Sequence, residues 1–131
     1  MSIYFLSSLV FTSGCFKAVM DTLQFHFSTS IFRNQPAQFW NPAVSWINKY
    51  TNSVTLAPKF FGSTTFLVFL TDAWHFFQTF FLEVFFISLV LYKPYFTEWH
   101  HIPGVILDYV LLRSIFGISY TLFYNYILLK K

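Results

Sequence analysis

The sequence predicts an all-α fold: an integral membrane bundle of about three transmembrane helices, plus a short interfacial helix in the first connection. Two observations predict this class. Hydrophobic residues make up 56% of the 131 residues and charged residues only 10%, whereas soluble domains carry roughly 25% charged residues. The second observation is three long apolar stretches. In water, 20 Phe, 8 Tyr and 4 Trp would leave large exposed apolar patches, and the length fits a single domain.

The three predicted spans cover residues 3–27, 63–92 and 103–129. Each exceeds the ~20 helical residues that cross a bilayer core, and the second is long enough to predict tilt or a protruding end. Lys93-Pro94 ends the second span because proline cannot continue a helix. Pro103 suits the first turn of the third span. A membrane sheet would have to close into a barrel, and three apolar runs without alternation cannot form one.

The interfacial helix is predicted at residues 42–50, after the start signal Asn41-Pro42. Apolar residues fall on one side of its helical wheel and polar residues on the other. Trp and Tyr favour the membrane interface. The predicted interfacial residues are Trp40, Trp46, Lys49 and Tyr50. Packing of this helix against the protein's own spans is the alternative.

Loop charges predict the orientation. The first connection carries three basic residues and no acid, and the C-terminus is also basic, whereas Lys93 and Glu98 cancel in the second connection. With three spans, the two basic regions share one side, which the positive-inside rule makes cytoplasmic. The N-terminus is then outside. The basic residues are Arg33, Lys49, Lys59, Lys130 and Lys131.

Ionisable residues within the spans are candidate functional residues, because each costs at least ~2.5 kcal/mol at the bilayer centre unless it is paired or hydrated. In the first span Lys17, Asp21 and Gln24 share a helical face, and Asp72 and His75 are one turn apart in the second. The 1.5 Å rise per residue places Asp21 and Asp72 roughly 12–14 Å deep. We therefore expect Lys17, Asp21, Asp72 and His75 to converge. Deeper in the bilayer, Glu83, Asp108 and Arg113 are expected to form a second polar network.

The candidate chemistry is acid/base or metal-dependent. Asp21, Asp72 and His75 are the candidate catalytic residues, with Asp72 or His75 as a general base acting on a lipid-like substrate. His26 and His75 are candidate metal ligands, although His26 lies about 140° round the helix from Asp21. The sequence contains no nucleophile or phosphate-loop motif. It identifies no cofactor.

Three segments resemble a family of small polytopic membrane proteins from Bacteroidetes. They are residues 21–27 (DTLQFHF), 39–50 (FWNPAVSWINKY) and 60–75 (FFGSTTFLVFLTDAWH). The resemblance covers most of the chain. It implies a bacterial inner membrane, and it implies no activity, cofactor or partner.

The expected function is that of a non-catalytic accessory or binding subunit of a membrane assembly. Its partners would be the lipid bilayer and other membrane proteins or further copies of itself. Nucleic acid is excluded as a partner because the few basic residues form no stripe interleaved with stacking aromatics. The alternative is an intramembrane enzyme built on Asp21, Asp72 and His75.

Overall fold

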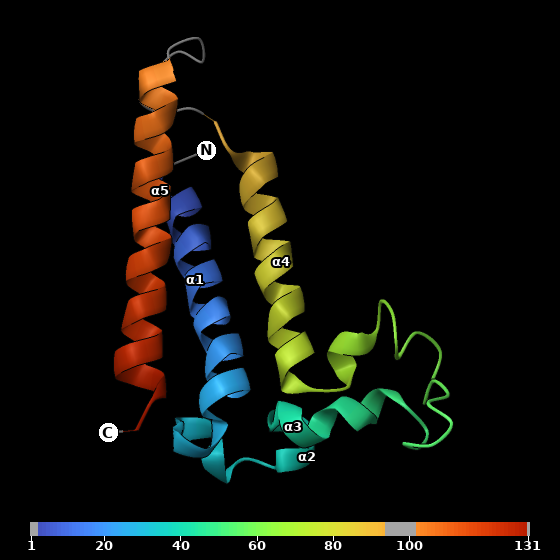
Figure 1. Ribbon diagram of the computed structural model, residues 1–131. Helices are drawn as coiled ribbons and strands as arrows, with labels where there is room; N and C mark the ends of the chain where they lie inside the picture. Colours follow the sequence, from blue (N-terminus) through green and yellow to red (C-terminus); the bar gives the residue numbers. More distant parts are fainter. Residues whose placement is uncertain (1–2, 94–101, 131) are drawn as a thin grey trace.

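The computed structural model describes residues 3–93 and 102–130, and Figure 1 shows its three long helices: α1 (Ile3–His26), α4 (Ala73–Leu91) and α5 (Ile102–Leu122). A π-helical segment, η5 (Phe123–Leu128), continues α5. All three are long and apolar enough to cross a membrane. No strand occurs in the described ranges, so the prediction of an all-α bundle is confirmed. Glu98 and Lys131, used in the charge argument, lie outside the described residues.

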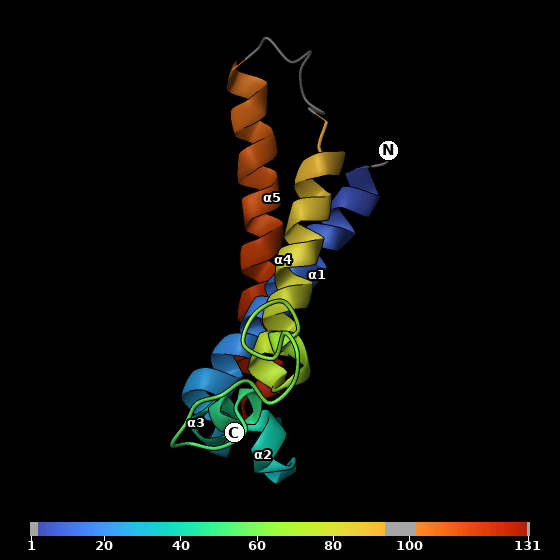
Figure 2. The same cartoon turned by 90° about the vertical axis from the view of Figure 1, so that its right-hand side faces the viewer.

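The central helix of the bundle is α1. In the described residues it makes nearly all of the contacts between spans, packing against both α4 and α5. Figure 1 shows α1 between α5 and α4, and Figure 2, turned by 90°, shows α4 lying along α1. Small buried residues on α1, Ser13, Gly14 and Ala18, suit this position because they let neighbouring backbones approach closely.

The second span begins at Ala73 and not near residue 63, which corrects the predicted boundary. Residues 63–72 instead form turns and the short 3₁₀ helix η4 (Val68–Leu70). The reason is Asp72, whose extended backbone and carboxylate cap the helix by accepting the His75 N–H at 2.9 Å. With 19 residues, α4 has only enough length to cross the bilayer core. The predicted tilt of the second span rested on a longer helix and is therefore no longer expected.

The first connection is a series of short helical turns: η1 (Phe27–Thr29), η2 (Ile31–Asn34), α2 (Ala37–Trp40), α3 (Pro42–Ser45) and η3 (Trp46–Lys49). The helix predicted at 42–50 is thus present as α3 followed by η3. Asn41 caps it as expected, its side chain accepting the Ala43 N–H.

The face that α3 turns toward the protein differs from the predicted apolar face. Ser45 is buried, whereas Val44 and Trp46 are exposed. The helix contacts α1, so it packs on the protein's own spans through a small polar residue. Its apolar side chains remain on the outside, where an interfacial helix would hold them.

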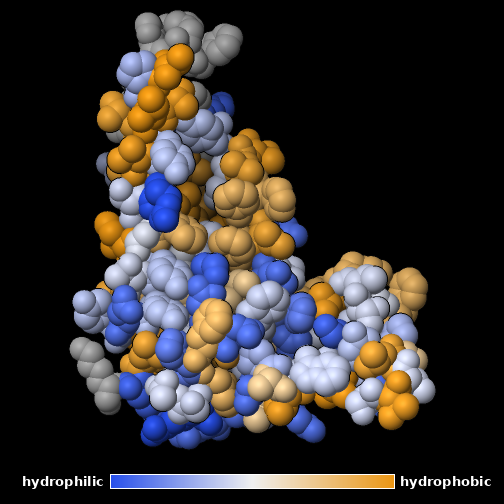
Figure 3. Space-filling view, in the orientation of Figure 1, coloured by the Kyte–Doolittle hydropathy of each residue, from blue (hydrophilic) through white to orange (hydrophobic). Residues whose placement is uncertain are grey.

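The C-terminus returns to the first connection. The Lys130 N–H donates to the Thr29 carbonyl at 3.0 Å, and Ser30 and Leu129 form a β-bridge. The described basic residues of these two regions therefore lie at one end of the bundle, and the N-terminus lies toward the other end (Figure 1). Figure 3 shows hydrophilic side chains gathered at the connection end and apolar ones over the opposite half.

Candidate functional site

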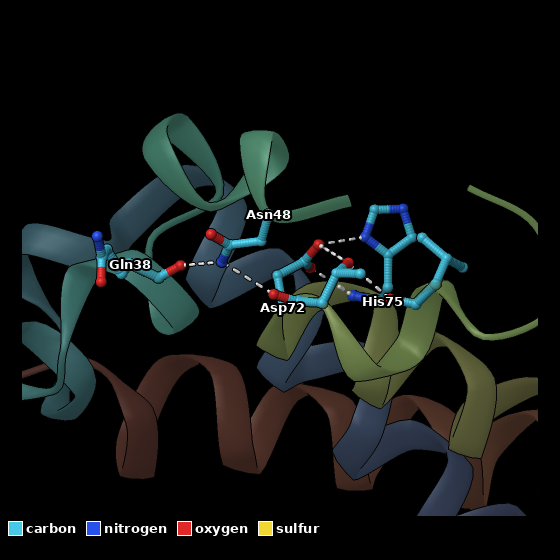
Figure 4. Close-up of polar contacts among 6 residues, drawn as sticks. Gln38, Asn48, Asp72 and His75 are labelled. Carbon is cyan, nitrogen blue, oxygen red and sulfur yellow. Dashed lines mark hydrogen bonds and ion pairs between the residues drawn. The ribbon is translucent and has the colours of Figure 1, made fainter. Parts of the chain in front are cut away.

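An aspartate and a histidine form a close pair at the beginning of α4. Asp72 Oδ2 lies 2.7 Å from His75 Nδ1 and accepts a further hydrogen bond from Thr71 Oγ1 at 3.1 Å. Asp72 is only 2% exposed. Figure 4 shows the second ring nitrogen of His75 turned away from the carboxylate. In a neutral imidazole whose Nδ1–H donates to Asp72, Nε2 is an acceptor that is available to a ligand.

Asp72 stays ionised. Burial alone would raise the pKa of this carboxyl, but hydrogen bonds from the side chain and backbone of His75, the positive charge that His75 carries when it is protonated, and the Thr71 hydroxyl together lower the pKa below its usual value. The carboxylate therefore places a negative charge beside the His75 ring at neutral pH.

Asn48 joins the first connection to this pair (Figure 4). Its side-chain amide donates to the Thr71 carbonyl at 3.0 Å and also to the Gln38 carbonyl. Asn48 of η3 is thus hydrogen-bonded both to α2, through Gln38, and to Thr71, the residue before Asp72. The predictions did not include Asn48, because an asparagine in an interfacial helix carries no local signal of a contact 23 residues away.

A pocket of about 210 Å³ opens beside His75. Ser45 lines this pocket, is 1% exposed, and its Oγ has no hydrogen-bond partner in the described structure. Sequence reasoning did not single out Ser45, which falls on the polar side of the predicted interfacial helix. The remaining lining residues are Gln24, Pro42, Trp46, Asp72, Trp74 and His75.

Lys17 and Asp21 form the predicted ion pair, but they belong to a different cluster. The other oxygen of Asp21 accepts from the Tyr120 hydroxyl at 2.9 Å, which joins α1 to α5. The hydrogen bonds described for Asp72 instead run to Thr71 and His75. The expected convergence of Lys17, Asp21, Asp72 and His75 is therefore not found, because Asp21 faces α5 while Asp72 caps α4. Gln24 is the polar residue of α1 that reaches the His75 pocket.

The predicted deeper network of Glu83, Asp108 and Arg113 is also divided. Asp108 is buried and accepts from the Tyr92 hydroxyl at 3.0 Å. Glu83 and Arg113 are exposed. The Arg113 guanidinium lies over the Phe116 ring, 5.6 Å from its centroid. Neither Glu83 nor Arg113 has an oppositely charged partner among the described residues.

The two candidate metal ligands lie in different surroundings. The His26 ring packs edge-on against Tyr124 at 5.6 Å, whereas His75 pairs with Asp72. Within the described ranges, no group of three or more His, Cys, Asp or Glu residues is placed to hold a metal ion.

A larger apolar cleft lies between α4 and α5. It measures about 640 Å³, within the range of ligand-sized sites. Leu6, Val10 and Ser13 of α1 form its floor, and aromatic residues of α4 and α5 form its walls, including Phe81, Phe85 and Phe116. Arg113 also lines it. The spans thus leave an open groove toward the lipid.

The fold and composition define a class, a three-helix integral membrane protein. Beyond the class, no protein-family model, curated protein or solved structure matches the chain. The case for a function consequently comes from the geometry of the pocket, the cleft and the charged residues.

Proposed function

We propose that this protein is a non-catalytic binding subunit of an assembly in the bacterial inner membrane, with its N-terminus outside and its C-terminus cytoplasmic. The observation that carries the proposal is Arg113, a charged residue exposed in the middle of a span. It stands 11 residues after Ile102 and 15 before Leu128. An unpaired charge at such a depth costs at least ~2.5 kcal/mol. Its contact with Phe116 offsets only part of that cost, because a cation–π contact contributes about 0.5–2 kcal/mol.

The surroundings of Arg113 favour a protein partner. The side chain lines the α4–α5 cleft, and α4 packs on α1 while leaving its outer faces exposed. A partner transmembrane helix seated in the cleft would bury the aromatic walls and bring an acidic residue to the guanidinium. Helix association in lipid is driven by such packing and polar contacts.

Glu83 is a second exposed charge within a span, and it lies on the face of α4 that points away from the cleft. It also favours a protein partner for these helices. It lies 10 residues after Ala73 and 8 before Leu91, is exposed, and does not line the cleft. A second copy placing its own Glu83 against Arg113 would bind head to tail, which extends into open chains unless a ring closes. The proposed occupant is therefore a helix of a different membrane protein.

Photo-crosslinking in native membranes tests this proposal. A photoreactive amino acid at Leu89, which lines the cleft, should yield an adduct with another membrane protein. The control position is Ile118 on α5, whose side chain is exposed to a similar degree as that of Leu89 but does not line the cleft. We expect no such adduct there. Arg113→Gln should abolish the Leu89 adduct. Lys93→Gln, which removes a charge beyond the end of α4, should preserve it.

Two results would contradict the proposal. Adducts with lipid alone at Leu89 would leave the cleft as a lipid-facing groove. An adduct with the mass of two copies, seen with differently tagged chains, would replace the foreign partner with self-association.

A second candidate function is acid/base catalysis on a lipid-like substrate. The observation in its favour is the Asp72–His75 pair beside a pocket, in which Asp72 would orient His75 as a general base. Asp21 would take no part, since it bonds Tyr120. If membranes from cells carrying His75→Ala or Asp72→Asn have the same lipid profile as the wild type, this candidate fails.

A further inference from the structure

We propose that the pocket beside His75 binds the primary ammonium group of a phosphoethanolamine lipid headgroup, with Lys49 placed to bind its phosphate. The site is separate from the α4–α5 cleft, and the inference does not depend on the partner helix proposed above.

The pocket lies at the depth of a lipid headgroup. Asp72 immediately precedes the membrane-spanning residues of α4, and Gln24 is in the last turn of α1. Trp46, from the short helices of the first connection, also lines the pocket and is 45% exposed, a placement that Trp favours at the boundary between hydrocarbon and water. The volume of about 210 Å³ suits a small polar group and excludes acyl chains.

The pocket offers a negative charge and unused acceptors. The ionised, buried Asp72 carboxylate supplies the charge. Ser45 Oγ is buried without a partner, an arrangement that is rare in proteins and calls for a ligand or water. In the neutral tautomer whose Nδ1–H donates to Asp72, His75 Nε2 is a second acceptor. A primary ammonium carries three N–H donors, which these acceptors would satisfy.

The walls of the pocket also favour a cation. Trp46 and Trp74 both line it, and the indole face attracts ammonium groups more strongly than other aromatic rings do. A neutral headgroup would gain no cation–π attraction from these rings. An anionic headgroup would also be repelled by Asp72.

Lys49 completes the headgroup site. Trp46 and Lys49 are three residues apart in the 3₁₀ helix η3, and residues at this spacing lie on the same face. The Lys49 ammonium lies 5.6 Å from the centre of the Tyr50 ring, and Tyr50 contacts Trp46. A phosphate bound there would be adjacent to an amine held in the pocket, as the two groups are within phosphoethanolamine.

Titration of the full-length protein in detergent with short-chain phosphatidylethanolamine, followed by tryptophan fluorescence, tests the site. We expect this lipid to bind at least tenfold more tightly than phosphatidylcholine, which lacks N–H donors, and phosphatidylglycerol, which lacks the cation. Ser45→Ala should weaken binding about tenfold, the equivalent of one hydrogen bond to a charged group. Trp46→Leu and Lys49→Gln should each weaken it as well.

The matched control is Ser13→Ala. Ser13 Oγ is likewise buried without a partner, but it lines the α4–α5 cleft. This variant should bind the lipid like the wild type. Neither serine hydroxyl has a described hydrogen bond to lose, so both variants should fold, which thermal unfolding would verify.

Three outcomes would overturn the inference. They are unchanged binding in Ser45→Ala, equal affinity for the choline lipid, and equal affinity for free phosphoethanolamine. The last of these would show that the pocket recognises a soluble group and not a lipid.

Discussion

Gly14 of α1 and Ser119 of α5 pack so closely that a β-carbon on Gly14 would stand 1.9 Å from Ser119 Oγ and 2.7 Å from the Phe116 carbonyl oxygen. Both residues are buried. The hydroxyl of Ser119 is already committed, donating to the Phe116 carbonyl at 2.9 Å. The backbones of two spans thus meet at this point, as small residues allow in membrane helices.

Gly14→Ala should destabilise the bundle. The added methyl group gains up to ~1 kcal/mol in helix propensity. It meets the Ser119 side chain and the Phe116 carbonyl oxygen, a backbone atom that cannot rotate away, and overpacking costs about 1–3 kcal/mol. Where the helix-propensity gain is realised in full, the expected net loss by these terms is up to about 2 kcal/mol. Reversible unfolding in mixed micelles would measure it.

Gly117→Ala is the control for this substitution. Its β-carbon would approach only an Arg113 guanidinium nitrogen, at 3.4 Å, and that flexible group can move. We expect no loss of stability and a gain of up to ~1 kcal/mol. Equal destabilisation by both changes would show that the α1–α5 contact is not as close as described.

Tyr120→Phe should loosen the same pair of helices at a contact seven residues further along α1. The Tyr120 hydroxyl donates to Asp21, whose other oxygen pairs with Lys17. A hydrogen bond to a charged group contributes about 1.5–3 kcal/mol, and unfolding in mixed micelles should show a loss in that range. Tyr109→Phe is the control, because the Tyr109 side chain is exposed and has no hydrogen bond described. A Tyr120→Phe variant as stable as Tyr109→Phe would contradict the prediction.

Much of the architecture could be predicted because lipid imposes it. Length and apolarity define the three spans, and proline and lysine mark where the second one ends. The wrong boundary was the beginning of that span. The residues from 63 to 71 are as apolar as a helix requires, and composition cannot show that the Asp72 side chain caps the helix and makes it begin at Ala73.

The candidate site could be predicted only in part, because helical spacing reports neighbours within a helix. It correctly paired Lys17 with Asp21 and Asp72 with His75. It could not show that Asp21 bonds Tyr120, 99 residues away, because that depends on how α1 rotates against α5. Ser45 and Asn48 were missed for the same reason: each acts through a tertiary contact.

The Asp72 carboxylate should make stability depend on pH in the acid range. Its pKa is lowered in the folded protein by His75 and Thr71, relative to about 3.9 in an unfolded chain. The folded state therefore binds the proton less readily than the unfolded state does. The stabilisation is fully present well above pH 4 and is lost as pH falls through the lower folded value.

Unfolding of the wild type and Asp72→Asn should be compared between pH 6 and pH 2.5. Asparagine can still cap the helix, but it does not ionise. The difference in stability between the two proteins should shrink as pH falls, while other carboxyl groups contribute equally to both and cancel. A difference that stays constant over this range would show that ionised Asp72 does not stabilise the fold.

Asn48→Ala should free the first connection from the beginning of α4. Both backbone carbonyls bound by the Asn48 amide, those of Gln38 and Thr71, would lose a donor. Hydrogen exchange of backbone amides should rise several-fold in residues 37–50 and around η4, with α1 and α5 unchanged. Asn125→Ala, an exposed residue with no hydrogen bond described, should leave exchange in these segments unaltered. Faster exchange throughout the bundle would instead mean that Asn48 supports the whole fold.

Single-cysteine labelling would test the proposed orientation. In a Cys15→Ser background, cysteines at Val54 and Lys130 should react with an impermeant maleimide only from the cytoplasmic side, and a cysteine at Lys93 only from outside. The reason is that Val54 belongs to the basic first connection, between the bridged residues Tyr50 and Pro58, and Lys130 bonds Thr29 of the same connection. Translocation of Lys and Arg is disfavoured. Val54 is 89% exposed, so poor reactivity there would reflect the membrane and not burial. Reaction of Val54 and Lys93 from the same side would show that α4 does not cross the bilayer, and reversal of all three positions would invert the proposed orientation while preserving the fold.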